Sequence, residues 1–180
     1  MRIVSGKFKS RILKAPIGFQ TRPSSDKTRE SIFNMLAPYL YKANILDLFS
    51  GSGALGIEAI SRGADKVTFI DCDVHAIQCI KENISSLKIE DQCEIIQDDF
   101  SIISSLKGKK FHIILLDPPY AMDIFYEVLH LIEENQLLAS NGIIVYESNE
   151  QHYLKNEIKG YRLKVKKYGI AYVSVLFKIQ

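Results

Sequence analysis

Between residues 44 and 147, short apolar runs alternate with longer segments of helical periodicity, and this alternation restricts the fold more than any other feature of the sequence. The runs are rich in Ile, Val and Leu, and apolar residues recur at helical spacing in most of the segments between them. Near-continuous apolar strands connected by helices are typical of a parallel sheet that is covered on both faces. We therefore predict an α/β fold with a mostly parallel sheet.

The individual elements follow from the same patterns. Strands are predicted over 44–49, 66–71, 93–97, 111–116 and 142–147, and helices over 27–37, 53–63, 73–87 and 122–135. Residues 161–179 contain two alternating strands around Gly169, which predicts an antiparallel hairpin at the sheet edge. Residues 2–15 predict a second, basic hairpin, and we expect a hairpin extension over 1–25 and one main domain over 26–180. Asp26 is the expected N-cap of the first helix.

Charge is distributed unevenly along the chain. Residues 1–30 contain eight Lys/Arg and two Asp/Glu, residues 31–154 contain eight and eighteen, and residues 155–180 contain seven and one. The ends therefore carry +6 each and the middle carries −10. Basic segments commonly contact nucleic-acid phosphates, although a solvated surface tail is an equally good interpretation of either end.

Several classes of protein fit the composition poorly. No apolar run reaches the ~18 residues of a membrane-spanning helix, and the N-terminus lacks the apolar stretch of a secretory signal. The three cysteines form no CxxC pair, and the four histidines lack metal-ligand spacing. We expect a cytoplasmic protein without a membrane partner and without a metal.

The first strand is followed by a glycine-rich turn, "DLFSGSGALG" (47–56). Gly51, Gly53 and Gly56 match G-x-G-x-x-G between a strand and a helix, where glycine lets a ligand approach the backbone. Asp71 ends the second strand 18 residues beyond Gly53, the usual place for an acid that binds ribose hydroxyls. This pattern predicts a site for an adenosine-type cofactor.

The charges around this turn favour one of two cofactor classes. Six aspartates lie at or near strand ends: Asp47, Asp71, Asp73, Asp98, Asp99 and Asp117. The sulfonium cation of S-adenosylmethionine suits such surroundings, whereas the pyrophosphate of a dinucleotide does not. No Lys or Arg occurs between Asp47 and Gly56 to offset the acids. We therefore expect S-adenosylmethionine, with S-adenosylhomocysteine as its product.

A second motif, Asp117-Pro118-Pro119-Tyr120, ends the fourth strand. An exocyclic amino group of a nucleobase is a poor nucleophile, because its lone pair is delocalised into the ring. The Asp117 carboxylate and the Pro118 carbonyl are acceptors that can hold its N–H bonds, and the rigid prolines keep both in place. The Tyr120 ring offers a face on which a flipped base can stack. These four residues are the predicted catalytic group.

Several stretches of the sequence resemble those of a known enzyme family. "LLDPPY" (115–120) resembles the signature of S-adenosylmethionine-dependent amino-methyltransferases. "DLFSGSGALGIEAISRGA" (47–64), "MRIVSGKFKSRILKAP" (1–16) and "TRPSSDKTRESIFNML" (21–36) extend the resemblance over essentially the whole chain. Together they resemble the bacterial small-subunit ribosomal RNA guanine-N2 methyltransferases that act on guanine 966 of 16S rRNA.

The resemblance implies a Rossmann-like, seven-stranded methyltransferase sheet with one antiparallel strand. It also implies roles for individual residues. The implied cofactor-binding residues are Asp47, Gly51, Ser52 and Gly53 near the methionine end, Asp71 at the ribose, and Asp99 and Phe100 at the adenine. Glutamate is common in relatives at the Asp71 position, and Asp98 beside Asp99 leaves the adenine assignment open by one residue.

The function implied is N2-methylation of a flipped guanine by direct in-line transfer. The partner is 16S rRNA within a small ribosomal subunit or assembly particle, and the enzyme is expected to be a monomer. The candidate phosphate contacts are Arg2, Lys7, Lys9, Arg11, Lys14, Arg22 and Arg29. A DNA adenine-N6 or cytosine-N4 methyltransferase is the first alternative. An NAD-dependent oxidoreductase leaves "DPPY" without a role, and a noncatalytic RNA-binding assembly factor leaves the strand-end residues without one.

Overall fold

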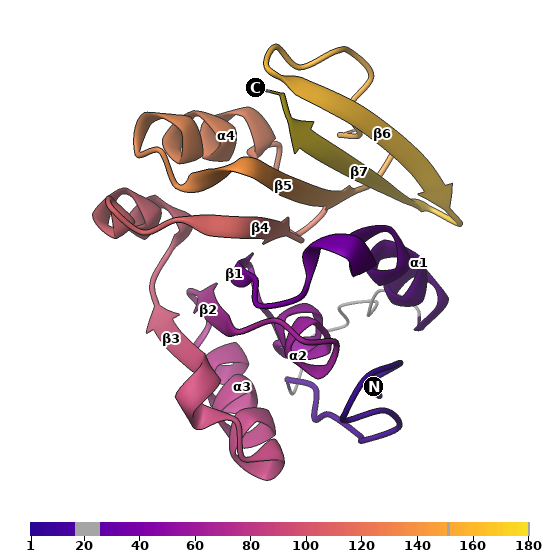
Figure 1. The fold of residues 1–180 in the computed structure, drawn as a ribbon, viewed down its shortest axis with the longest axis vertical. Helices are drawn as coiled ribbons and strands as arrows, with labels where there is room; N and C mark the ends of the chain where they lie inside the picture. The colour runs from indigo at the N-terminus through magenta and orange to yellow at the C-terminus, as the bar shows by residue number, and fades with distance from the viewer. Residues whose placement is uncertain (17–25, 151, 180) are drawn as a thin grey trace.

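A single seven-stranded sheet, in the order β3-β2-β1-β4-β5-β7-β6, organises the chain in a computed structural model that describes residues 1–16, 26–150 and 152–179 (Figure 1). The strands are β1 (Asn44–Leu48), β2 (Lys66–Asp71), β3 (Cys93–Gln97), β4 (Phe111–Leu116), β5 (Leu138–Ser148), β6 (Tyr161–Tyr168) and β7 (Ala171–Lys178). Strands β1 to β5 pair in parallel. Strand β7 runs antiparallel to both β5 and β6, so the predicted mostly parallel sheet with a C-terminal hairpin is confirmed.

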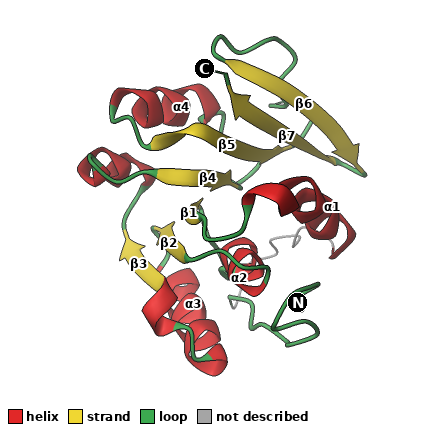
Figure 2. Cartoon of the chain, viewed as in Figure 1, coloured by secondary structure: helices red, strands yellow, loops and turns green. Residues whose placement is uncertain are grey.

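Helices cover both faces of this sheet (Figure 2). The helices are α1 (Asp26–Leu36), α2 (Ala54–Ser61), α3 (Val74–Leu87) and α4 (Phe125–Glu134). One apolar cluster joins α1, α2 and α3 to one face, and a second joins α4 and the short 3-10 helix η3 (Phe100–Leu106) to the other. None of the helices in the described ranges is both long and apolar enough to cross a membrane.

Most predicted elements lie within a few residues of their observed bounds, and three differences have physical causes. Strand β5 begins four residues earlier than predicted, where the chain approaches β4 beside a register shift. Helix η3 was not predicted, because a short 3-10 segment carries no helical periodicity. Asp26 lies in the first turn of α1, where its carboxylate accepts from the side chains of Arg2 and Arg29.

The N-terminal segment folds back on itself and packs against α2 and α3. Arg2 and Ile12 form one antiparallel bridge, supported by a backbone hydrogen bond from Ile3 N to Arg11 O. The expected basic hairpin is therefore present as a turn with a single bridge. The residues that follow Arg2 are anchored by Glu58 of α2, whose carboxylate accepts from the backbone N–H groups of Val4 and Ser5. The end of the expected extension, residues 17–25, lies outside the described residues, as does Arg22.

Candidate functional site

The carboxyl ends of four neighbouring strands form an acidic edge, because β2, β1, β4 and β5 are adjacent in the sheet. Asp71 ends β2, Asp47 lies in β1, Asp117 follows β4 and Glu147 lies near the end of β5. In open α/β sheets this edge is where ligands bind. The topology thus brings both predicted motifs, the glycine turn and the proline turn, onto one edge.

The glycine turn is tied to the end of β2 by Asp71. One carboxylate oxygen of Asp71 accepts from Gly51 N at 2.8 Å, and the other accepts from Asp73 N at 2.9 Å. Asp73 in turn caps α3 by accepting from His75 N and Ala76 N. Each carboxylate oxygen has a further lone pair, so Asp71 keeps acceptor capacity for a ligand.

The glycines of the turn serve two different purposes. Gly51 has a positive φ of 55°, and a Cβ placed there would meet nothing within 4 Å, which leaves open space over the turn. Gly56 is needed for packing, because a Cβ there would lie 2.4 Å from the ring of Phe69 on β2. Gly51 thus fits a close backbone approach by a ligand, whereas Gly56 lets α2 lie against the sheet.

Asp47 has a buried carboxylate oxygen that lacks a polar partner among the described residues. Its side chain is 1% exposed, and its Oδ2 accepts from Gly56 N at 2.9 Å. Its Oδ1 is buried and has no hydrogen-bond partner among the described residues. Burial, opposed by the Gly56 N–H and reinforced by the charge of Asp71, raises the pKa of Asp47 to about 8. A buried acceptor without a partner is rare and marks a functional position.

These features allow a test of the expected cofactor. The ammonium group of S-adenosylmethionine is a cationic donor that could supply the partner missing from Asp47 Oδ1, and its sulfonium, which has no N–H or O–H, would be favoured by nearby acids through its charge alone. The open space over Gly51 and the remaining lone pairs of Asp71 also suit this ligand. The residues present therefore fit S-adenosylmethionine better than a dinucleotide, whose pyrophosphate would meet these acids.

The expected adenine end lies after β3, two strands from Asp47. Asp99 caps η3 through a 2.7 Å bond from Ser101 N, and this contact with Ser101 lowers the pKa of the Asp99 carboxyl. Asp98 accepts from Asp99 N at 2.8 Å, and both aspartates are exposed. The rings of Phe100 and Phe49, which lies just after β1, face each other at 6.0 Å between centroids. Phe49 is not among the residues predicted from the sequence, and it lies within the glycine turn with a positive φ of 65°.

The proline turn places Asp117 beside Glu147. Leu116 pairs with Tyr146 in the parallel register of β4 and β5, so Asp117 and Glu147 come next on adjacent strands. Burial, then the charge of Glu147, then that of Asp47, raises the pKa of Asp117 well above its usual value. Tyr120 Oη donates to Glu147 Oε1 at 3.4 Å. Sequence analysis missed Glu147, because an acid within "YES" has no motif around it.

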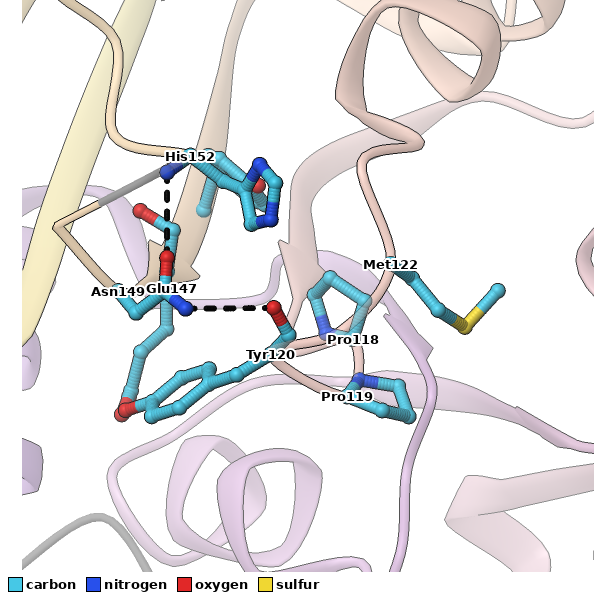
Figure 3. A pocket seen from close by; sticks show the side chains of 9 residues that line it. Pro118, Pro119, Tyr120, Met122, Glu147, Asn149 and His152 are labelled. Carbon is cyan, nitrogen blue, oxygen red and sulfur yellow. Dashed lines mark hydrogen bonds between the residues drawn. The ribbon is translucent and has the colours of Figure 1, made fainter.

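Glu147 and the proline turn line a shallow hollow at the surface (Figure 3). The figure shows Asn149 Nδ2 donating to the backbone oxygen of Tyr120, and His152 N donating to Asn149 Oδ1. The imidazole of His152 also lies 3.6 Å from the carboxylate of Asp123. These contacts join the loop after β5 to the loop after β4. The other lining residues are Pro118, Pro119, Met122, Tyr146 and Ser148.

The predicted phosphate contacts that lie within the described residues bond to several different elements. Lys7 bonds to Gln92 just before β3, at the sheet edge opposite Asp117, whereas Lys14 bonds to Glu82 on α3. Arg2 pairs with Asp26, Arg11 donates to the backbone oxygen of Ser86, and Lys9 is exposed.

Arg29 requires a correction. Its side chain is 1% exposed, and it donates to Arg2 O at 2.7 Å and to Asp26 Oδ1 at 2.8 Å. Its Nε also lies 3.8 Å from Glu58 Oε2. Arg29 therefore holds the hairpin against α1 and α2, and it is not placed to contact phosphate.

Within the described residues, no group of three or more His, Cys, Asp or Glu side chains could hold a metal ion.

The sheet order, the glycine turn and the acidic edge together define a Rossmann-like methyltransferase fold. The family model described as "Conserved hypothetical protein 95" matches residues 1–177, and the chain belongs to this family.

Individual relatives agree with this assignment. The Bacillus subtilis protein named "Putative rRNA methyltransferase YlbH" is 40% identical over 99% of both chains. "Ribosomal RNA small subunit methyltransferase D" of Escherichia coli is 36% identical over 86% of this chain and 77% of its own. Among solved structures, "Putative methyltransferase yhhF" from Escherichia coli superimposes with a TM-score of 0.88 at 32% identity, covering 99% of this chain and 97% of its own.

Proposed function

We propose that this protein transfers a methyl group from S-adenosylmethionine to the exocyclic N2 amino group of a guanine in 16S rRNA, at position 966. The observation that carries the proposal is the position of Asp117 at the same acidic edge as the glycine turn and the orphaned Oδ1 of Asp47. The rRNA methyltransferase names of the relatives support rRNA as the substrate. Their match covers the N-terminal basic segment as well as the sheet.

The residues of the glycine turn would hold the cofactor. Asp47 and the backbone of Gly51, Ser52 and Gly53 would receive its methionine end, and Asp71 its ribose. Asp99 and Phe100 would meet the adenine, with Asp98 as the neighbouring alternative. When bound, S-adenosylmethionine supplies an electrophilic methyl group.

The residues of the proline turn act on the base. The Asp117 carboxylate and the Pro118 carbonyl accept hydrogen bonds from the amino group and direct its lone pair away from the ring plane. Pro119 keeps the turn rigid, and the half-buried ring of Tyr120 provides a stacking face for the base. Burial and the charge of Glu147 raise the pKa of Asp117, whereas hydrogen bonds from the amino group would favour its ionised form, which only accepts.

The remaining parts of the proposal concern the partner. A chain of 180 residues has little surface for a long RNA, so we propose that a monomer docks on a structured ribosomal particle. The exposed basic residues of the N-terminal segment would contact phosphates there.

The test is methyl transfer from labelled S-adenosylmethionine to undermethylated small ribosomal subunits, naked 16S RNA and duplex DNA. Asp117→Ala serves as the control. We expect label in N2-methylguanine of ribosomal RNA with the natural chain and none with the variant. Label in DNA adenine, or a fully active variant, would overturn the proposal.

A further inference from the structure

Glu147 is a second carboxylate at the site, and the proposed function does not use it. Its side chain is 5% exposed and lies in the hollow beside the proline turn. The register of β4 and β5 sets it beside Asp117, and adjacent strands in a sheet are roughly 4.8 Å apart. Two carboxyl groups on neighbouring strands therefore lie next to each other beside the proline turn.

Acceptor groups dominate this arrangement. Burial and the charge of Glu147 both disfavour the charged form of Asp117. No lysine or arginine is among the described residues that line the hollow, and His152 there lies 3.6 Å from Asp123. A ligand with two adjacent N–H donors would match two neighbouring carboxyl groups.

Only one of the candidate bases has that pattern. On the Watson–Crick edge of guanine, N1–H and the 2-amino group are adjacent donors. Adenine and cytosine present a ring nitrogen acceptor next to their amino group, and a carboxylate would repel that acceptor. We propose that Glu147 accepts the N1–H of the target guanine while Asp117 accepts from its 2-amino group, so that Glu147 sets the specificity for guanine. This inference rests on the proposed function and goes beyond it.

Tyr120 gives an internal reference for the proposal. Its hydroxyl contacts Glu147, so a purely structural account would make Glu147 a tether for the Tyr120 ring. In that case Tyr120→Phe and Glu147→Gln would alter the enzyme in the same way. If Glu147 reads N1–H, only Glu147→Gln changes the choice of base.

The experiment compares guanine with 2-aminopurine at the target position of 16S rRNA in reconstituted small subunits. 2-Aminopurine keeps the amino group that accepts the methyl but has an acceptor at N1. We expect the natural chain to prefer guanine by about a hundredfold, since a site that hydrogen-bonds an N–H strongly rejects an analogue without it. In Glu147→Gln the amide can donate to N1, so the preference should fall at least tenfold, with faster transfer to 2-aminopurine than in the natural chain.

The controls separate this inference from the proposed function. Tyr120→Phe should keep the preference, and Asp117→Asn should lower transfer to both bases. An unchanged preference in Glu147→Gln, or equal transfer to both bases by the natural chain, would overturn the role of Glu147 alone. A natural chain that methylates neither base, despite binding S-adenosylmethionine, would overturn the proposed function and this inference with it. Retained cofactor affinity in Glu147→Gln verifies that the variant is folded.

Discussion

Asp47 and Glu58 are both buried carboxylates, and the structure treats them in opposite ways. Glu58, on α2, is 0% exposed and accepts from Val4 N at 2.7 Å, Ser5 N at 3.0 Å and Arg62 Nε at 2.7 Å. Asp47, at the acidic edge, has one backbone donor and one oxygen without a partner. Glu58 serves the fold, whereas Asp47 is left unsatisfied at a cost in stability.

The same contrast holds for the two regions around these residues. Where the N-terminal segment packs against α2, cations and backbone donors surround Glu58, and Arg29 is buried with it. At the acidic edge, Asp47, Asp71, Asp117 and Glu147 lie at or next to the ends of adjacent strands, and the pKa values of Asp47 and Asp117 are raised. Buried atoms without a hydrogen-bond partner among the described residues occur in both regions, since Arg29 Nε and Arg62 Nη2 are among them, but the carboxylate oxygen left in this state belongs to the acidic edge. Four substitutions test this contrast, the largest expected effect first.

Asp117→Asn should have the largest effect. The amide has one acceptor oxygen in place of two and carries no negative charge, so it holds the amino group less firmly, and we expect methyl transfer to fall about a thousandfold. Cofactor affinity should be unchanged, because Asp117 belongs to the base side of the edge. Single-turnover transfer and calorimetric titration measure the two quantities separately. Transfer within tenfold of the natural chain would remove Asp117 from the chemistry.

Glu58→Gln should be the most destabilising of the four. The change leaves Arg29, which is 1% exposed, and Arg62 without their carboxylate, and breaking such a buried pair costs about 3 kcal/mol. Urea unfolding at neutral pH gives the value. Glu82→Gln is the matched control, because its ion pair with Lys14 is exposed and should contribute little to stability. Equal losses in both variants would mean that burial of Glu58 is not what matters.

Asp47→Asn should stabilise the protein without ligand by about 2 kcal/mol at pH 7, because it removes a buried acid that costs energy to keep. The sign follows from the pKa of about 8 in the folded chain, which lies above the usual value of 3.8 for an aspartate. The folded state holds the extra proton between these values, so the contribution of Asp47 to stability falls as pH rises from about 4 to about 8.

Unfolding at pH 5, 7 and 8.5 measures this dependence. The difference between Asp47→Asn and the natural chain should grow over this range, and the variant should bind S-adenosylmethionine more weakly. A variant that is less stable than the natural chain at pH 7 would place Asp47 in the same class as Glu58.

Sequence patterns predicted the strands of the sheet, because each strand is marked by residues that are neighbours in the sequence. Apolar runs, the glycine turn and "DPPY" are each contiguous, and parallel topology brings their ends to one edge. The acids at Asp47, Asp71 and Asp117 could be found in this way, although their contacts with a ligand remain predictions.

What the sequence could not predict depends on residues that are distant along the chain. The sequence alone indicates that Arg29 is an exposed cation on a helix, whereas the fold places its side chain beside Glu58. Glu147 gains meaning only from the register that sets it beside Asp117. The missing partner of Asp47 Oδ1 is likewise a property of packing, and no pattern of residue types encodes it.

The smallest expected effect concerns the exposed charges of the N-terminal segment. Replacing Lys7 and Lys9 by Gln should weaken RNA binding only a few-fold, because exposed cations act additively and are screened by salt. The slope of log affinity against log salt should become shallower by about 0.7–0.9 for each lost phosphate contact. Lys107→Gln with Lys110→Gln removes the same charge from exposed positions ahead of β4, and it should leave the slope unchanged. If both pairs change the slope equally, RNA binding depends on the net charge of the protein. The exposed lysines of the N-terminal segment then have no specific role, and the segment contributes through its packing against Glu58.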